Sequence, residues 1–430
     1  MTEGKIVVGI DIGTSKIVSV IAKVDEYVNV LGVSEVPAAG VRKGQIVDIE
    51  EAVLSINNSL ESAERMAGYS ASHIIASIGG GHVESQNSRG VVAVARPEGE
   101  ITENDVARVI EAAKAVSLPS SREIIHVLPR SFIVDGQEGI KDPIGMTGIR
   151  LEVDTHIISA NSTSIRNMEK AFSQVGVDLD AVVFSGYASS MAVLSDTEKE
   201  LGVVLVDLGA GTTDISIYVE GSVAYSSVVP IGARHITNDL AIGLRISLES
   251  AEKIKLFLSN PIKKSKISEN GTEEKPIDRI SDEIDLSPLG LTEELRKVSK
   301  KTLVEGIIRP RLNELFTMVG LEIKKAGFAG QTPSGLVITG GGARTVGASD
   351  AAKRMLAMPV RIATAANIKG IIDEIQEPSF SAVIGLLMYG VNIESSSSLP
   401  FGFSFPKFSN IKLNSQSVTK IISFFKSFLP

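Results

Sequence analysis

Short runs of β-branched and other apolar residues open the chain, separated by Gly, Asp and Asn. The runs are residues 5–10, 16–23 and 27–36. Their length and the turn residues between them predict a three-stranded antiparallel meander. A helix should follow, because Asp48 and Glu51 form a capping pair and apolar residues then recur at helical spacing up to Gly68. Residues 73–79 return to a strand pattern.

The pattern changes between about residues 84 and 161, where longer strand-like runs dominate. These runs are residues 90–95, 123–134 and 149–159. One helix is predicted over 103–116, capped by Thr102 and Asp105. We therefore expect an α+β subdomain to be inserted here into the main fold.

The opening meander recurs in the second half of the chain, after a helix over 162–176, a buried strand over 181–184 and a helix that follows Gly186. The recurring strands are residues 202–208, 213–219 and 223–230. Gly9–Lys16 aligns in register with Leu205–Thr212. An internal repeat of this kind predicts two related lobes that face each other.

After the repeat, a loop is predicted over residues 259–288. Helices are predicted over 291–325 and 347–357, with a strand over 336–339 between them. The loop segment is charged and lacks a hydrophobic period, which is typical of a solvated excursion. Residues 394–416 contain four consecutive serines and two prolines, which predicts a flexible linker.

Composition narrows the classes of function. A chain of 430 residues exceeds the usual size of one hydrophobic core and should divide into domains. Its 43 basic and 51 acidic residues give a net charge of -8, which argues against nucleic acid as a partner. The absence of Cys excludes disulfides, thiolate metal sites and cysteine nucleophiles. No apolar stretch reaches the ~20 residues of a membrane span, and the opening residues do not resemble a signal peptide, so we expect a cytoplasmic location.

Each meander places an Asp-x-Gly sequence at a tight turn between two strands. Glycine lets the backbone N–H groups of such a turn face an anion without a Cβ in the way. Two turns, one from each lobe, predict a clamp for a polyphosphate. Its residues are Gly13, Thr14, Ser15 and Lys16 in the first turn and Gly209, Ala210, Gly211, Thr212 and Thr213 in the second. Asp11 and Asp207 add two carboxylates, which suffice for a Mg²⁺ ion that also binds water and phosphate oxygens.

Either turn alone is also ordinary hairpin chemistry, and only their pairing favours a phosphate site. A third glycine run, Gly340-Gly341-Gly342-Ala343, follows a buried strand and opens a helix, where the backbone can approach a nucleotide closely.

Together these motifs resemble the actin, Hsp70 and sugar-kinase superfamily and, within it, the FtsA family of bacterial cell-division proteins. The superfamily elements are the two phosphate turns and an adenosine motif at Ile338–Ala343. The segments more specific to the FtsA family are Pro230-Ile231-Gly232, His235–Ala241, Ala251–Lys255, His126–Pro129 and Asp142–Met146. The chain departs from the family pattern at Ser185 and Gly186, where Glu and Pro are usual, so we assign no water-orienting residue there.

The resemblance implies an α/β, actin-like two-lobed ATPase fold that binds ATP and Mg²⁺. The implied subdomains are 1A over 1–83, completed by 162–195 and 365–393, 1C over 84–161, 2A over 196–245 with 311–364, and 2B over 246–310. By analogy, Gly232, Glu252 and Lys255 would face the ribose and adenine, with Gly340–Ala343 beneath them. Because Glu252 and Lys255 lie three residues apart on a predicted helix, a surface ion pair is the competing interpretation.

Hydrolysis of ATP also requires a positioned water, and no residue stands out as its base. The five histidines are scattered along the chain, and Asp11 and Asp207 suit metal binding better than proton transfer. We expect nucleotide binding with at most slow ATPase activity, which would act mainly through lobe closure and polymer contacts.

Residues 417–430 predict an amphipathic helix. Its apolar face consists of Val418, Ile421, Ile422, Phe425, Phe428 and Leu429, with Phe424 at the edge and Lys420 and Lys426 beside it. This pattern is typical of a helix that lies in a membrane surface with its lysines at the headgroups. A terminal helix docked on the protein's own core is the alternative, against which the long polar linker argues.

The resemblance implies the same membrane anchor, with self-association into filaments that would multiply it. Implied partners are the C-terminal peptide of the tubulin-like division protein FtsZ, bound around residues 240–310, and other proteins of the division machinery. The implied location is the inner face of the cell membrane at the division site. An actin-like pilus-assembly ATPase, an Hsp70-like chaperone and a sugar-kinase-like phosphotransferase are the alternatives. A chaperone would need a substrate-binding domain after its ATPase core, and kinases lack a membrane tail.

Overall fold

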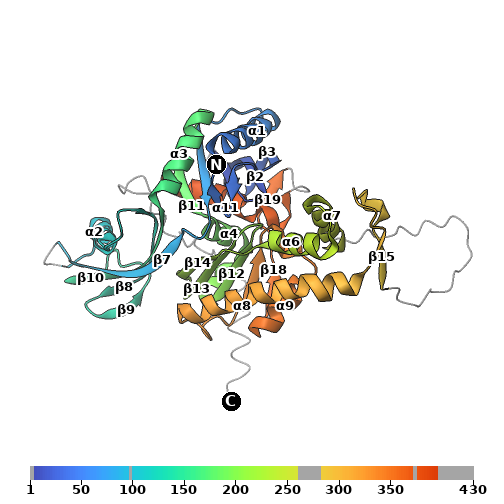
Figure 1. Ribbon diagram of the computed structural model, residues 1–430. Helices are drawn as coiled ribbons and strands as arrows, with labels where there is room; N and C mark the ends of the chain where they lie inside the picture. Colours follow the sequence, from blue (N-terminus) through green and yellow to red (C-terminus); the bar gives the residue numbers. More distant parts are fainter. Residues whose placement is uncertain (1–3, 96–98, 260–281, 371–374, 396–430) are drawn as a thin grey trace, which may run out of the picture. The chain divides into compact units, whose positions relative to one another are not determined.

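The computed structural model describes residues 4–95, 99–259, 282–370 and 375–395, and Figure 1 shows how their elements are arranged. The described residues up to Val391 belong to one compact unit. Three sheets of four or more strands organise this unit. Two of them carry the duplicated meanders, and the third lies in the inserted segment.

The first sheet has six strands in the order β11-β6-β1-β2-β3-β19. Their bounds are β1 Lys5–Ile12, β2 Lys16–Val24, β3 Val28–Pro37, β6 His73–Ile78, β11 Asp178–Phe184 and β19 Ile368–Gly370. Strands β1, β2 and β3 pair antiparallel, which confirms the predicted meander. Strands β6, β11 and β19 join the sheet in parallel register.

Helices cover both faces of the first sheet. They are α1 (Ile49–Ala67), α3 (Ser162–Val175), α4 (Ser185–Val193) and α11 (Ser381–Ser395). Helix α1 begins at the predicted cap, where the Asp48 side chain accepts a hydrogen bond from the Glu51 N–H. The apolar sides of α1 and α3 share one core with Ile10. Helix α11 packs on the opposite face, where a Cβ on Gly9 would lie 3.2 Å from Leu386.

The second sheet has five strands in the order β14-β13-β12-β17-β18. Their bounds are β12 Val203–Leu208, β13 Thr213–Val219, β14 Ser222–Val229, β17 Leu336–Thr339 and β18 Val360–Ile362. Strands β12, β13 and β14 pair antiparallel as β1, β2 and β3 do, which confirms the predicted repeat. The accompanying helices are α5 (Asp196–Leu201), α6 (Ala233–Leu244), α7 (Leu248–Ser259), α8 (Arg309–Ala326) and α9 (Ala348–Leu356).

The inserted segment forms an antiparallel sheet in the order β7-β10-β8-β9, with one helix. The bounds are β7 Glu84–Ala93, β8 Arg122–Val134, β9 Gln137–Ile140, β10 Arg150–Asn161 and α2 Glu103–Lys114. Helix α2 has the predicted capping box between Thr102 and Asp105. The sheet docks on edge strand β14, because the Ser85 hydroxyl donates to the Ser226 carbonyl (2.6 Å) and the His156 ring contacts the Ser226 hydroxyl (3.0 Å).

Two predictions near the middle of the chain are wrong in detail. The helix expected over 291–325 is shorter, because β16 (Lys297–Ser299) pairs with β15 (Glu283–Asp285) and a π-helical turn, η2 (Thr302–Ile308), precedes α8. Pro310 lies in the first turn of α8, where its missing N–H is tolerated, so the regular helix begins there. The segment expected to be a loop contains β15 and the 3₁₀ turn η1 (Ser287–Leu289).

Four short elements complete the described chain. They are β4 (Val41–Arg42), β5 (Gln45–Ile46), η3 (Gly341–Arg344) and η4 (Pro378–Phe380). Of the helices in the described part of the chain, none combines the length and apolarity needed to cross a bilayer. Helix α11 runs to Ser395 and so includes the first two residues of the linker predicted over 394–416. The rest of that linker and the helix predicted over 417–430 lie outside the described residues.

Candidate functional site

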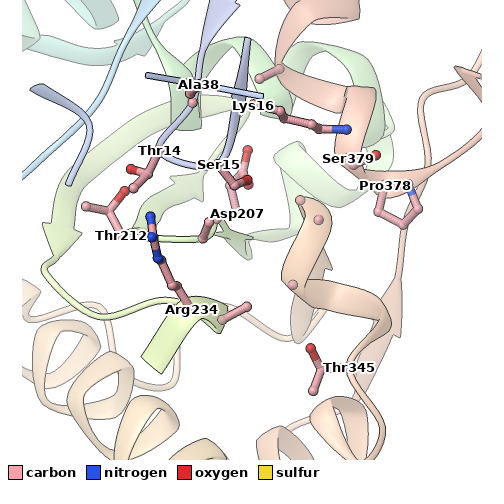
Figure 2. A pocket seen from close by; sticks show the side chains of 18 of the residues that line it. Thr14, Ser15, Lys16, Ala38, Asp207, Thr212, Arg234, Thr345, Pro378 and Ser379 are labelled. Carbon is pink, nitrogen blue, oxygen red and sulfur yellow. The ribbon is translucent and has the colours of Figure 1, made fainter. Parts of the chain in front are cut away.

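A cavity of about 670 Å³ opens between the first and second sheets (Figure 2). The β1–β2 turn, the β12–β13 turn, α6, α7, η3 and η4 contribute its walls. The expected site residues that line it are Asp11, Gly13, Thr14, Ser15, Lys16, Asp207, Gly209, Ala210, Thr212, Glu252, Lys255, Gly340, Gly341 and Gly342. Segments more than 300 residues apart in sequence thus meet at one site.

The two turns at the cavity have the same backbone geometry. The Gly13 N–H donates to the Lys16 carbonyl at 3.0 Å, and the Gly209 N–H donates to the Thr212 carbonyl at 3.0 Å. The N–H groups of Thr14 and Ser15 in the first turn and of Ala210 and Gly211 in the second have no acceptor among the described residues. Free N–H groups on both sides of a cleft are suited to an anion such as a phosphate chain.

Four expected residues do not line the cavity: Gly211, Thr213, Gly232 and Ala343. A Cβ on Gly211 would lie 2.7 Å from the Thr14 hydroxyl oxygen, so the tips of the two turns touch. Thr213 is fully buried and donates its hydroxyl to a backbone carbonyl. A Cβ on Gly232 would lie 2.6 Å from carbonyl oxygens of the second turn. Thr213 and Gly232 thus pack behind the second turn, Gly211 lies at its tip, and Ala343 is fully buried.

Three carboxylates gather where the turns begin. Asp11 on β1 accepts a hydrogen bond from the Ser77 hydroxyl (2.6 Å), and Asp207 on β12 accepts one from the Ser189 hydroxyl. Asp214 lies opposite Asp207 in the β12–β13 ladder, and its buried Oδ1 has no hydrogen-bond partner among the described residues. The sequence pattern predicts Asp11 and Asp207 as site residues but not Asp214.

Burial raises the pKa of all three carboxyl groups. For Asp11, the Ser77 hydrogen bond and the charge of Lys16 offset part of the increase. The pKa of Asp207 rises to about 7, because burial and the charge of Asp11 outweigh the Ser189 hydrogen bond. Burial, with the charges of Asp207 and Asp11, raises the pKa of Asp214 well above its ordinary value. A divalent cation would relieve this mutual repulsion.

The carboxylates fit a Mg²⁺ ion that also binds phosphate oxygens. Such an ion needs only one or two carboxylates beside water and phosphate, and the unpartnered Oδ1 of Asp214 is a free acceptor for a ligand water. Within the described ranges, no group of three or more His, Asp or Glu side chains is arranged to hold a metal ion by itself.

The nucleotide-free protein should lose stability as the pH rises from about 5 to 8. Asp207 has a pKa of about 7 when folded and about 4 when unfolded, so the folded state holds a proton that the unfolded state has released. Asp207→Asn keeps an acceptor for Ser189 and removes this proton. Its free energy of unfolding should vary less with pH in urea unfolding. Equal pH slopes for the two proteins would contradict the assignment.

Lys16 lines the cavity, but an acidic neighbour holds its ammonium group. Its Nζ lies 2.5 Å from a Glu35 carboxylate oxygen and 4.5 Å from the centre of the Phe380 ring. In Figure 2 the side chain points toward Ser379. A phosphate would have to compete with Glu35 for this lysine.

Glu252 and Lys255 form an ion pair of 2.8 Å on α7. Lys255 is buried and also donates to the Thr237 hydroxyl at 2.9 Å, whereas Glu252 is partly exposed. Both side chains line the cavity. The ion pair anticipated as the competing interpretation therefore exists, and it lies in the cavity wall.

Gly340, the first residue of the third glycine run, packs closely against the Asp207 carboxylate. Its φ of 84° and ψ of 165° lie in a region that side chains with a Cβ rarely adopt. A Cβ at this position would lie 2.1 Å from the Asp207 Oδ1. The Gly340 N–H donates to the Pro378 carbonyl at 3.0 Å, which joins the glycine run to η4.

Several charged residues of the cavity are not predicted from the sequence pattern. They are Glu35, Asp214, Arg234, Glu249, Arg344 and Glu377. Asp214 had a signal in the repeat, because it occupies the position that Val18 has opposite Asp11 in the first meander. Arg234 is the second residue of α6 and has no local pattern that distinguishes it from a surface arginine.

Two family models match the chain. A model described as an SHS2 domain inserted in FtsA matches residues 80–159, and one described as cell division protein FtsA matches residues 204–385. Three relatives have the name cell division protein FtsA. That of Pseudomonas aeruginosa is 36% identical over 91% of both chains. That of Borreliella burgdorferi is 41% identical over 89% of this chain and 90% of its own. That of Escherichia coli K12 is 33% identical over 90% of this chain and 91% of its own.

Solved structures of low sequence identity share the fold. The PilM-PilN type IV pilus biogenesis complex aligns with a TM-score of 0.62 at 14% identity and covers 90% of this chain and 98% of the other. MreB5 of Spiroplasma citri bound to ADP aligns with a TM-score of 0.52 at 14% identity, covering 92% and 98%. These matches confirm an actin-like α/β fold with an inserted subdomain. The pilus-assembly alternative is thus supported by fold alone.

Proposed function

Since this chain belongs to the FtsA family of cell-division proteins, we propose that it binds ATP with Mg²⁺ in the cavity between its two large sheets. The observation that carries the proposal is the pair of equivalent turns, both with free N–H groups, that line one cavity beside three partly or fully buried carboxylates. The MreB5 structure, which shares the fold, is described as bound to ADP.

The wall residues suggest how the nucleotide would lie. The turn N–H groups would hold the phosphates, and Asp11, Asp207 and Asp214 would hold Mg²⁺ directly or through water. The ion supplies positive charge to the phosphate oxygens. Leu248 and Leu256 on α7 line the cavity with 48% and 54% of their surface exposed, and would offer the adenine an apolar wall.

We propose binding with at most slow hydrolysis. No histidine lines the described part of the cavity, and its three aspartates Asp11, Asp207 and Asp214 are better placed to hold the cation than to activate water. Nucleotide would then act by setting how closely the two lobes approach.

We propose subdomain boundaries that coincide with the sheets. We assign the first sheet and its helices to subdomain 1A, and residues 84–161 to the inserted subdomain 1C. The second sheet belongs to subdomain 2A, and residues 246–310, which include α7, β15, β16 and η2, form subdomain 2B.

At the cell level, we propose that the protein polymerises and tethers the FtsZ ring to the inner face of the cell membrane. The amphipathic pattern of residues 417–430 supports the anchor. The C-terminal peptide of FtsZ would bind around residues 240–310, and other division proteins would join the filament. Because a filament carries many such helices, it would bind the membrane more tightly than a single molecule does.

Asp207→Asn tests the proposed cation site. Calorimetric titration with ATP and excess Mg²⁺ should give an affinity about 10- to 100-fold below that of the wild type, because a charge-assisted contact is lost. Titration with ATP in EDTA should give similar affinities for both proteins, since the cation is then absent. An equal loss in both conditions, or no loss in either, would remove Asp207 from the cation site.

A further inference from the structure

The charges around the cavity are unbalanced. The acidic residues that line it are Asp11, Glu35, Asp207, Asp214, Glu249, Glu252 and Glu377, and the basic ones are Lys16, Arg234, Lys255 and Arg344. Three of the four basic side chains are paired with acidic ones, in the pairs Lys16–Glu35, Lys255–Glu252 and Arg344–Glu377. The guanidinium of Arg234 has no hydrogen bond or ion pair with any described residue.

The backbone holds Arg234 beside the second turn. Its N–H donates to the Ala210 carbonyl at 2.8 Å. Figure 2 shows its side chain pointing from the start of α6 into the cavity, toward Thr212 and Thr14. Those two threonines lie at the tips of the facing turns, and the tips touch at Gly211. The Arg234 side chain therefore points to the part of the cavity where the two turns meet.

Another part of the cavity wall has a different character. There α7 presents Leu248 and Leu256, and the glycine run beginning at Gly340 leads into η3. An apolar wall fits a base, and the two turns fit phosphates, so the phosphate chain should run toward the touching tips. Its last phosphate would then lie nearest to Arg234.

We propose that Arg234 binds the terminal phosphate of the nucleotide and makes the site prefer a triphosphate to a diphosphate. This inference rests on the proposed nucleotide binding. A guanidinium offers two parallel N–H donors to a phosphate. Arg234 gives up no ion pair with a described residue to do so, whereas Lys16 would first have to leave Glu35. The negative charge of a third phosphate would therefore pair with Arg234, which has no other acidic partner among the described residues.

The experiment compares ATP and ADP, each with Mg²⁺, on the wild type and on Arg234→Gln. The variant should bind ATP about 10- to 100-fold more weakly, while its affinity for ADP should stay close to that of the wild type. Arg234→Lys keeps the charge without the two parallel donors and should recover part of the loss. Arg354→Gln, an exposed arginine on α9 outside the cavity, is the matched control and should change neither affinity.

The outcomes separate the two proposals. If the wild type binds ATP but Arg234→Gln loses nothing, or loses ATP and ADP affinity equally, the role of Arg234 in sensing the terminal phosphate is overturned. If the wild type binds neither nucleotide, the proposed nucleotide site itself fails. A selective loss of ATP affinity, partly restored by Arg234→Lys, supports the inference.

Discussion

Gly340→Ala should abolish measurable ATP binding and destabilise the fold by about 2–5 kcal/mol. The new Cβ would lie 2.1 Å from the Asp207 Oδ1 and 2.7 Å from the Leu208 carbonyl oxygen, both well inside contact distance. Alanine would also have to adopt a φ of 84°. Asp207 must move away, which disrupts the proposed cation site. Urea unfolding and calorimetric titration with ATP and Mg²⁺ measure the two effects.

Gly341→Ala is the matched control for this prediction. Gly341 is the next residue, and a Cβ there would meet only the Ser379 Cβ, at an ordinary distance of 3.6 Å. Its stability should therefore change by less than about 1 kcal/mol. Similar stabilities for the two variants would show that the close approach of Gly340 to Asp207 is not a constraint on this fold.

A pair of charges on the apolar face of the proposed tail helix should release the protein from membranes. Burial of each Ile or Phe contributes about 1.5–3 kcal/mol, so Ile421→Asp combined with Phe425→Asp should lower vesicle affinity by at least about 100-fold. Co-sedimentation with vesicles that contain anionic lipid measures the loss. ATP binding should be unchanged, because the substitutions lie outside the body that forms the cavity.

Ser423→Asp combined with Ser427→Asp adds the same charge to the other side of the proposed helix. At 100° per residue, Ser423 and Ser427 would point away from its apolar face. This control should keep most of the vesicle binding. If both double variants sediment equally with vesicles, charge alone decides the result, and the proposed insertion of the apolar face is wrong.

Much of the fold follows from local pattern. The β-branched runs of the two meanders, the caps at Asp48 and Thr102, and the strand before Gly340 predicted elements that the structure confirms. Each of these signals is contained in a stretch of about ten residues. The in-register repeat extended them to a prediction of two facing lobes, because a repeated meander implies two related sheets.

What the pattern missed depends on contacts between distant segments. Helical spacing continued through residues 291–301, but β16 pairs there with β15, and no local periodicity reveals a partner strand. Lys16 carries the charge expected at a phosphate, yet the β2–β3 pairing brings Glu35 within reach of its ammonium. The availability of Arg234 is likewise a tertiary property, since it depends on which acidic side chains the fold places elsewhere.

A crystal structure with ATP and Mn²⁺ in place of Mg²⁺ would test the central claim most directly, because Mn²⁺ takes similar oxygen ligands and has an anomalous signal. We predict nucleotide density between the two turns and an anomalous peak bound, directly or through water, to Asp11, Asp207 or Asp214. An empty cavity at saturating ATP, or a peak away from all three carboxylates, would contradict the account.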